Sequence, residues 1–555
     1  MPSLLHQRWQ VQNQDLTKPL AERLFINRSI LAEKQESFLS PDFERDLHDP
    51  YEMSGMKEAV VRIKEAVGSK EKILIFGDYD TDGVTAAALL YQLFEKIGAK
   101  TEVYLPHRVE DGYGLSDDLI EKFGQQGVSL LVTVDCGISN ASEVIKAKKQ
   151  GMEVIVTDHH SVPDDLPDTI VINPRQNACR YPFKKLAGVG VAFKLAWALA
   201  YEFLPKEEAE YFIKWNMDLV ALGTIADVTP LAGENRTLVA YGLQVLNRTK
   251  KLGLKKLLEV AEKKGVSDEV TVGFAIAPRL NAAGRIGGPQ IAFDLLVTRD
   301  DKKAEELARK LDGLNKKRQQ MVEEAIQEAD EMLDTSQGIL LLRKDHWHQG
   351  ILGLIAGKLT ERYHRPVLAV GHSKEGLVGS ARSPLYFNII EAIRRHADLF
   401  IHHGGHSQAA GFSLLEKNWA ALQKVMKKEA KVIKEKDLQA VLTLDTEIKP
   451  DEITLKNAKD LARFAPFGPE NEEILFLLKR AKLLGCQQVG PEGKHLSLSF
   501  QVGEQTYRGI AFRMGEYSSR LQREKLYDLA AKLQINEWQS KEKVEMQVID
   551  LREAV

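Results

Sequence analysis

The stretch from Lys72 to Leu90 constrains the fold more than any other part of the chain. It reads KILIFGDYDTDGVTAAALL: an apolar run typical of a strand buried on both faces, three aspartates at alternate positions, and a run that favours a helix. Carboxylates this close repel one another and lose hydration on burial, so Asp78, Asp80 and Asp82 favour a site for a divalent cation. The alternative is a polar strand-to-helix turn that Asp82 merely caps.

Beyond Met56, strand and helix signals alternate regularly. This alternation predicts an α/β fold in which helices cover both faces of a parallel sheet. The predicted strands are Ile73–Phe76, Glu102–Leu105, Leu130–Val134, Glu153–Val156 and Thr169–Ile172, and the helices between them include Gly83–Ile97 and Ala141–Gln150.

Metal-competent side chains follow several of these apolar runs. Asp135 follows LLVTV, the triplet Asp158-His159-His160 follows VIVT, and Asp227 ends an apolar helical run. The carboxyl ends of parallel strands lie at one edge of a sheet, which is where ligands bind. Carboxylates with one or two imidazoles favour Mn²⁺ or Mg²⁺ over a structural zinc ion, and six or more ligands favour two ions. Two ions about 3.5–4 Å apart that share a carboxylate form a clamp for hydrolysing phosphate esters.

Four motifs, GDYDTDG, VDCG, TDHH and GGHSQAAG, resemble the marks of the DHH phosphoesterase superfamily with its DHHA1 partner domain. Within it the chain resembles the RecJ family, because LPHRVEDGYGL, INPRQ, LAGVGVAFKLAWAL, APRLNAAGRIG, WHQGILGLIAGKL and GSARS follow in the expected order from about residue 50 to the C-terminus. The resemblance implies a single-stranded-DNA-specific 5′→3′ exonuclease. It would hydrolyse phosphodiester bonds by a two-metal mechanism and release 5′-mononucleotides in DNA repair and recombination.

The resemblance also implies roles for individual residues. One metal would be held by Asp82, Asp135, His159 and Asp227. The other would be held by Asp80 and Asp135, with help from Asp78, and Asp135 would bridge the two ions. Some relatives have a histidine where this chain has Phe76. Asp158 and His160 would orient the ligand imidazole or contact the phosphate. The expected catalytic residues are Asp80, Asp82, Asp135, His159, His160 and Asp227.

A second set of residues is expected to bind the substrate. Arginine presents a planar fork that matches phosphate oxygens, and small residues beside it let the backbone approach closely. The resemblance assigns Arg382 and His406 to the face opposite the metals. The candidates for holding a terminal 5′ phosphate are Arg108, Arg279, Arg285, Ser380, Arg382 and His406. For the segment Gly273–Gly288, which carries Arg279 and Arg285, the alternative is a close helix–helix contact.

Five regions are expected: an N-terminal arm with short helices (1–50), a DHH catalytic domain (51–233), a helical region that ends in one long helix (234–334), a DHHA1 substrate-binding domain (335–436) and an OB-type nucleic-acid-binding domain (437–555). The last domain is predicted from short strands at regular spacing, which favour a small β-barrel. Such barrels bind single strands through basic and aromatic side chains. The candidates here are Phe512, Tyr507, Trp538, Lys494 and Arg508.

Composition limits the remaining possibilities. The net charge of −3 gives no global cationic field, so a nucleic acid would bind through local patches. The three cysteines are too scattered for a zinc knuckle or a disulfide framework, which suits a reducing cytoplasm. No apolar run is long enough for a membrane span, and the first residues lack the apolar core of a secretion signal.

The expected ligands and partners are two Mn²⁺ or Mg²⁺ ions and single-stranded DNA with a 5′ end. The resemblance adds a single-strand-binding protein and a helicase, and a monomer is expected. One alternative is a DHH phosphoesterase for oligoribonucleotides or cyclic dinucleotides, although those relatives generally end after the DHHA1 domain. Another is a non-catalytic DNA-binding factor, against which the intact ligand set argues.

Overall fold

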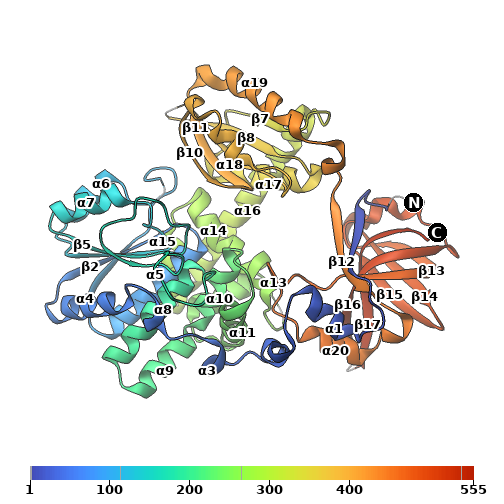
Figure 1. Ribbon diagram of the computed structural model, residues 1–555, viewed down its shortest axis with the longest axis horizontal. Coiled ribbons are helices and arrows are strands. Elements are labelled where there is room, and N and C mark those ends of the chain that lie inside the picture. Colours follow the sequence, from blue (N-terminus) through green and yellow to red (C-terminus); the bar gives the residue numbers. More distant parts are fainter. Residues whose placement is uncertain (1–2, 113, 264, 375, 539–540, 555) are drawn as a thin grey trace. The chain divides into compact units, whose positions relative to one another are not determined.

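The computed structural model describes residues 3–112, 114–263, 265–374, 376–538 and 541–554. By its packing the chain divides into two units. One unit contains residues 41–360 and 366–427, and the other contains residues 1–40, 361–365 and 428–555. Figure 1 shows three sheets, two in the first unit and one in the second. No helix in the described ranges is long and apolar enough to cross a bilayer.

The first sheet is parallel and has five strands, in the order β3-β2-β4-β5-β6. The strands are β2 (Lys72–Gly77), β3 (Lys100–Tyr104), β4 (Leu130–Val134), β5 (Glu153–Thr157) and β6 (Ile170–Ile172). The chain leaves β2 in one direction to β3 and returns on its other side to β4, so the strand order reverses between β2 and β4. Such a reversal opens a crevice at the carboxyl ends of the two strands.

Alternate residues of these strands point to opposite faces and build two apolar cores. Ile73 and Ile75 face the larger core, whereas Leu74 and Phe76 face the smaller one. The larger core is covered by α4 (Met56–Gly68), α5 (Thr81–Lys96) and α8 (Gly188–Phe203), and the smaller one by α6 (Asp117–Gln125) and α7 (Ala141–Lys149). The predicted parallel sheet with helices on both faces is confirmed.

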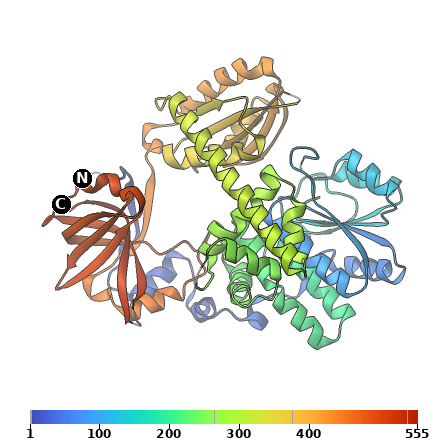
Figure 2. The same ribbon diagram turned by 180° about the vertical axis from the view of Figure 1, so that it is seen from behind.

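A helical region follows the sheet. Its helices are α9 (Lys206–Trp215), α10 (Met217–Ala226), α11 (Gly233–Leu246), α12 (Leu252–Val260), α13 (Glu269–Thr271), α14 (Ala277–Ile286), α15 (Gln290–Val297) and α16 (Asp301–Met332). A short π-helical turn, Val272–Ile276, precedes α14. Figure 2 shows α16 as one continuous helix that leads into the second sheet.

The second sheet of this unit has five strands in the order β10-β11-β9-β8-β7. Only β7 and β8 pair in parallel; the other neighbours are antiparallel. Its strands are β7 (Leu340–Arg343), β8 (Val367–Ser373), β9 (Gly376–Arg382), β10 (Phe400–His406) and β11 (Ala409–Leu414), and its helices are α17 (Leu352–Tyr363), α18 (Ile389–Arg394) and α19 (Trp419–Glu429).

The other unit contains a closed five-stranded barrel, as predicted for an OB-type domain. Strands β13, β14, β15, β17 and β16 pair in that order, and β16 pairs again with β13. The elements are β12 (Val441–Glu447), β13 (Phe476–Val489), β14 (His495–Val502), β15 (Gln505–Ala511), β16 (Leu526–Trp538), β17 (Lys541–Glu553) and α20 (Leu455–Ala462).

The N-terminal segment differs from the expected arm of short helices. Its first element is a strand, β1 (Arg8–Asn13), which pairs in parallel with β12. The helix α1 (Leu20–Asn27) buries Leu24 and Phe25 in the core beside the barrel. Two short helices follow, α2 (Gln35–Leu39) and α3 (Phe43–Asp46). Arg8 to Gln12 do alternate in polarity, but the strand is short and its partner lies more than 400 residues away in the chain, so it was missed.

Candidate metal centre

The acidic residues singled out in the sequence gather where the strand order reverses. Asp78 and Asp80 follow β2, Asp135 follows β4, and Asp158 to His160 follow β5. Asp227 is brought to the same place by α10, because it forms the C-terminal cap of that helix. Carboxylate and imidazole atoms of three groups lie within 4.8 Å of one another: Asp82, His159 and Asp227; Asp78, Asp80 and Asp135; Asp135, His159 and His160.

The start of α5 arranges the aspartate triplet. Asp80 caps the helix, and its Oδ1 accepts hydrogen bonds from the backbone N–H groups of Asp82 (2.9 Å) and Gly83 (3.2 Å). A second helix holds Asp82: both of its carboxylate oxygens accept from the first N–H groups of α8, Gly188 at 2.7 Å and Val189 at 2.8 Å. The positive end of a helix therefore partly compensates the most buried carboxylate of the triplet.

Gly188 makes room for the cluster, because a Cβ at this position would collide with the carboxylate of Asp135. We expect Gly188→Ala to push Asp135 out of place and to weaken Mn²⁺ binding about 10–100-fold, which is the usual effect of losing a support of a metal ligand. Calorimetric titration with Mn²⁺ measures this. Gly190→Ala in the same helix is the control, because its Cβ would approach no atom closer than Leu186 at 3.3 Å. Equal affinities in the two variants would contradict this reading.

The histidine pair is oriented from behind by Asp158. Its Oδ1 accepts from the backbone of His159 (2.7 Å) and lies 2.8 Å from Nδ1 of His160. Nδ1 of His159 lies 3.2 Å from the carbonyl of Leu186 and donates to it, which leaves Nε2 as the atom with a lone pair. Nε2 lies 3.1 Å from Asp135 Oδ1 and 3.7 Å from Asp227 Oδ2.

The donor atoms fit a divalent cation. Asp135 Oδ1 and His159 Nε2 are buried and have no hydrogen-bond partner among the described residues. Buried polar atoms in this state are costly unless a ligand satisfies them. Asp135 also has a backbone φ of 61°, a strained value for an aspartate that a functional site can sustain. Carboxylate oxygens with one imidazole nitrogen suit Mn²⁺ or Mg²⁺.

Crowding of negative charge shifts the pKa values in the protein without metal. Burial, then Asp82 and Asp80, raises the pKa of Asp227 to about 9. Burial and Asp80 raise the pKa of Asp82 to about 7. Burial lowers the pKa of His159 to about 3, so this imidazole is neutral and able to bind a cation. Burial would lower the pKa of His160, but the hydrogen bond to Asp158 together with the negative charges of Asp158, Asp227 and Asp78 outweighs it and raises that pKa to about 9.

These shifts predict how pH affects the metal-free protein. The folded-state pKa of Asp227, about 9, lies above the ordinary aspartate value of about 4. Its stabilising contribution is therefore complete below pH ~4 and is lost as the pH rises toward 9. We expect Asp227→Asn to raise the melting temperature in EDTA at pH 8 by a few °C, on the order of 2–4 °C per kcal/mol. Thermal unfolding from pH 5 to pH 9 tests this; a lower melting temperature of the variant at pH 8 would refute it.

Next to the carboxylates lies a group of cationic side chains. Arg108 stacks over the ring of Tyr79 at 5.2 Å, within the acidic motif itself. Burial, then Arg108 and Arg318, lowers the pKa of Arg285 to about 10. Burial, followed by Arg108, also lowers the pKa of Arg382, so these guanidinium groups share one region. Repelling cations held together while partly buried form a site for an anion.

The second sheet contributes the other part of this basic cluster, which we define as Arg108, Arg285, Arg318, Ser380 and Arg382. Nη1 of Arg382 donates to Ser380 Oγ at 3.2 Å and to the carbonyl of Ala381 at 2.9 Å. A Cβ on Gly353 would come within 3.1 Å of the Arg382 guanidinium, so the glycine leaves this space open. Nη1 of Arg285 donates to the carbonyl of Gly350 at 3.3 Å, which ties α14 to the turn before α17.

Two further candidates for the phosphate site have different surroundings: Arg279 is already paired, whereas His406 lies opposite Ala409, which in turn lies opposite Arg382 in the sheet. Arg279 forms an ion pair with Asp312 at 2.8 Å and donates to the carbonyl of Ala275, so its charge and its fork are already used. His406 lies on the exposed strand β10, and its ring has no hydrogen-bond partner among the described residues. Gly284 packs closely against the loop after β2, where a Cβ would collide with the carbonyl of Tyr79, and the helix–helix contact in this segment is at Gly287, where a Cβ would meet Leu314 of α16.

The candidates for strand binding in the barrel differ in the exposure of their side chains. Phe512 is exposed, at 52% of its surface, and Arg508 is exposed as well. Tyr507 belongs to the core, and its hydroxyl donates to the carbonyl of Ile453 at 3.1 Å. Lys494 is exposed beside Glu492. The side chain of Trp538 lies outside the described residues.

Sequence reasoning missed three contributors. The backbone of Gly188 and Val189 carries no side-chain signal. Asn281 accepts from the N–H and hydroxyl of Thr81, at 2.8 and 2.9 Å, and so fixes the acidic motif to α14. Arg318 lies on α16, and its Nε is buried without a partner among the described residues.

Comparison with known proteins agrees with this geometry. Three family models match: DHH family, N-terminal domain, at residues 72–224; DHHA1 domain at 336–433; and RecJ OB domain at 444–550. The single-stranded-DNA-specific exonuclease RecJ of Haemophilus influenzae is 35% identical over 96% of this chain and 95% of its own length. The chain belongs to the RecJ family. RecJ of Bacillus subtilis is 38% identical over 98% of this chain and 70% of its own length.

The fold is also that of RecJ. A crystal structure of RecJ from Thermus thermophilus in complex with Mn²⁺ superposes with a TM-score of 0.84 and 30% identity, covering 99% of this chain and 80% of the other. A structure of exonuclease RecJ bound to manganese gives a TM-score of 0.61 and 35% identity over 69% of this chain and 96% of the other. As a member of the RecJ family, the chain is a metal-dependent nuclease.

Proposed function

We propose that this RecJ-family protein is a single-stranded-DNA exonuclease that works from the 5′ end and releases 5′-mononucleotides in repair and recombination. The proposal rests on one observation: Asp82, Asp135, His159 and Asp227 lie together at the edge of the sheet. Two of their metal-binding atoms, Asp135 Oδ1 and His159 Nε2, are buried without a hydrogen-bond partner among the described residues. The curated relatives named above are single-stranded-DNA-specific exonucleases.

We assign two ions to the cluster. Asp82, Asp135, His159 and Asp227 would hold one, and Asp78, Asp80 and Asp135 the other, so that Asp135 is shared. When bound, such ions polarise the phosphate and activate water. Asp158 fixes the positions of the two histidines, and His160 would contact the phosphate. Asn281 and the start of α8 keep the carboxylates in place.

We assign the polarity of the reaction to the basic cluster. Arg108, Arg285, Ser380 and Arg382 would bind a terminal 5′ phosphate, because guanidinium forks bind phosphate oxygens in pairs. A phosphate held there would set the first phosphodiester bond at the metals, so that degradation begins at the 5′ end and advances by one nucleotide. Arg318 joins this set on the ground of its unpartnered Nε.

The remaining expectations extend this proposal. Each region would have its own role: residues 1–50 the arm, 51–233 catalysis, 234–334 the connection, 335–436 substrate binding and 437–555 strand binding. The strand β1 is assigned to the strand-binding part, because it pairs with β12. Phe512 and Arg508 are candidates for strand binding by the barrel. We expect a monomer that works in the cytoplasm on ends supplied by a helicase and coated by single-strand-binding protein.

A time course on single strands labelled at either end, with and without Mn²⁺, tests the proposal. A 5′ label should appear as mononucleotide from the first time points, and a 3′ label should remain on progressively shorter strands. A duplex of the same sequence should persist. Release of the 3′ label first, or faster cleavage of dinucleotides than of long strands at equal concentration, would overturn the proposal. The latter result would favour a small-substrate phosphoesterase.

A further inference from the structure

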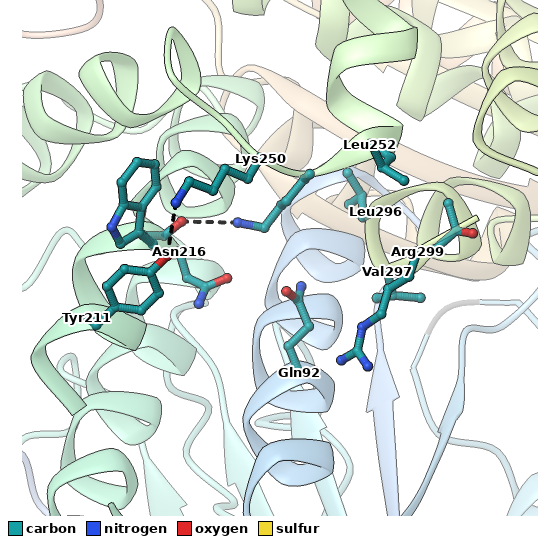
Figure 3. Close-up of a pocket in the computed structure, with 11 residues that line it drawn as sticks. Gln92, Tyr211, Asn216, Lys250, Leu252, Leu296, Val297 and Arg299 are labelled. Carbon is teal, nitrogen blue, oxygen red and sulfur yellow. Dashed lines mark hydrogen bonds between the residues drawn. The ribbon is translucent and has the colours of Figure 1, made fainter. Parts of the chain in front are cut away.

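A second cavity lies among the helices away from the carboxylates (Figure 3). Its volume is about 390 Å³, within the usual range for small-molecule sites. Its walls come from α5, α9, the start of α10, the segment before α12, and the end of α15. The residues that matter for its chemistry are Gln92, Tyr211, Trp215, Asn216, Lys250 and Arg299.

One wall is aromatic and positively charged. The rings of Tyr211 and Trp215, on successive turns of α9, lie 5.8 Å apart between centroids, and Tyr211 is half exposed. Nζ of Lys250 lies 4.7 Å from the centre of the Trp215 ring and 3.4 Å from the Tyr211 hydroxyl. Among the described residues no carboxylate pairs with Lys250, whereas the neighbouring Lys251 is neutralised by Asp218 at 2.7 Å. Lys250 is therefore a cation available to an anionic ligand.

Two amide oxygens also face the cavity, one beside the aromatic wall and one across from it. Asn216 is only 6% exposed; its Nδ2 donates to the carbonyl of Phe212 at 2.8 Å, but its Oδ1 has no partner among the described residues. Nε2 of Gln92 donates to the carbonyl of Ala88 at 3.1 Å, which turns its oxygen to the other side. Figure 3 shows the Asn216 amide pointing toward Gln92 across the cavity. A ligand that satisfies these oxygens must bring hydrogen-bond donors.

We propose that this cavity binds a nucleoside phosphate whose base carries an amino group. A flat base would stack on the aromatic wall, as bases do on exposed tyrosine and tryptophan rings. Its amino group would donate to Asn216 Oδ1, since side-chain amides recognise base edges. Its phosphate would take Lys250 as counter-ion, with Arg299 at the rim. A purely apolar ligand would leave both the cation and the amide oxygen unsatisfied.

This site is separate from the metal centre. α5 carries Asp82 in its first turn and Gln92 about three turns later, roughly 15 Å along the axis at 1.5 Å per residue. α10 (Met217–Ala226) is capped by Asn216 at its start and by Asp227 at its end, which are separated by a comparable length. A nucleotide in the cavity therefore touches the far ends of the two helices that present metal ligands, but it cannot reach the metals. It is a second nucleotide site and not a part of the reaction path.

Calorimetric titration of the full chain in EDTA with deoxyadenosine 5′-monophosphate tests the proposal. Besides binding of the same 5′ phosphate at the basic cluster, we expect one nucleotide to bind in this cavity, and Lys250→Glu and Tyr211→Ala should each weaken that binding at least tenfold. Lys255→Glu, an exposed lysine on α12 that does not line the cavity, is the matched control and should bind as the unsubstituted chain does. Arg382→Ala should also leave this binding unchanged. Thermal unfolding verifies that each variant is folded.

Three further measurements test the identity of the ligand and its position in the cavity. Thymidine 5′-monophosphate, which lacks the amino group, should bind more weakly. Quenching of tryptophan fluorescence by the adenine nucleotide should diminish in Trp215→Phe. If Lys250→Glu weakens binding of a 5′-phosphorylated oligo(dA) strand as much as it weakens binding of the mononucleotide, a strand end is the source of the ligand; if it weakens only mononucleotide binding, the free nucleotide is. Absence of binding at millimolar concentration, unchanged affinity in Lys250→Glu, or loss of binding in Arg382→Ala would overturn the proposal.

Discussion

Asp135→Ala is expected to lower the rate of single-strand hydrolysis by at least about 10³-fold, because removing one charge-stabilising donor from an active site already costs 10²–10³. The carboxylate of Asp135 lies 3.1 Å from His159 and belongs to two of the three ligand groups, so its loss would damage both proposed ion sites. Initial rates on a 5′-labelled strand in Mn²⁺ measure the effect, and calorimetry should show that fewer ions bind.

A matched control is Asp164→Ala, which removes an exposed carboxylate from the loop after the histidine pair. It should retain the full rate. Should Asp135→Ala keep more than about a tenth of the rate at saturating Mn²⁺, the carboxylate is not a shared ligand and the two-ion assignment fails.

Arg382→Ala is expected to change which 5′ end the enzyme accepts. Because a charge-assisted hydrogen bond to phosphate contributes about 1.5–3 kcal/mol, the variant should lose about 10–100-fold in kcat/KM on 5′-phosphorylated strands. Strands with a 5′ hydroxyl should be affected much less, because they lack the group that the guanidinium binds. Competition between the two strands in one reaction measures the ratio directly.

Arg394→Ala is the control for this experiment, since Arg394 lies on α18 of the same region, is about half exposed and pairs only with Glu391 at 3.0 Å among the described residues. It should leave the ratio of the two rates unchanged. An unchanged ratio in Arg382→Ala would show that the basic cluster does not read the terminal phosphate.

Much of the fold was predictable because its signals are local. The strand at Leu130–Val134 is apolar except for Thr133, and the structure begins and ends it at the same residues. The long helix expected at the end of the helical region runs from Asp301 to Met332, because apolar residues recur at helical spacing over that whole length. By contrast, β1 became a strand only through its partner β12, and a six-residue segment does not reveal a partner so distant in sequence.

The site was predictable for the same reason and to the same extent. Aspartates that end apolar runs can be recognised in the sequence, and the reversal of strand order brings Asp82 and Asp135 together. Asp82 is held by backbone N–H groups of α8. Every residue except proline has such a group, so these contacts cannot be predicted from residue types. Arg279 resembled a phosphate ligand until the structure placed Asp312 beside it, since an arginine in a polar helix offers the same sequence pattern in both roles.

Anomalous diffraction from crystals grown with Mn²⁺ tests the central claim most directly. We expect two peaks in the carboxylate cluster, one beside His159 and Asp227 and the other beside Asp78 and Asp80, with Asp135 in contact with both. No peak at this edge of the sheet in crystals of protein that hydrolyses single strands in the same Mn²⁺ buffer would contradict the two-ion assignment.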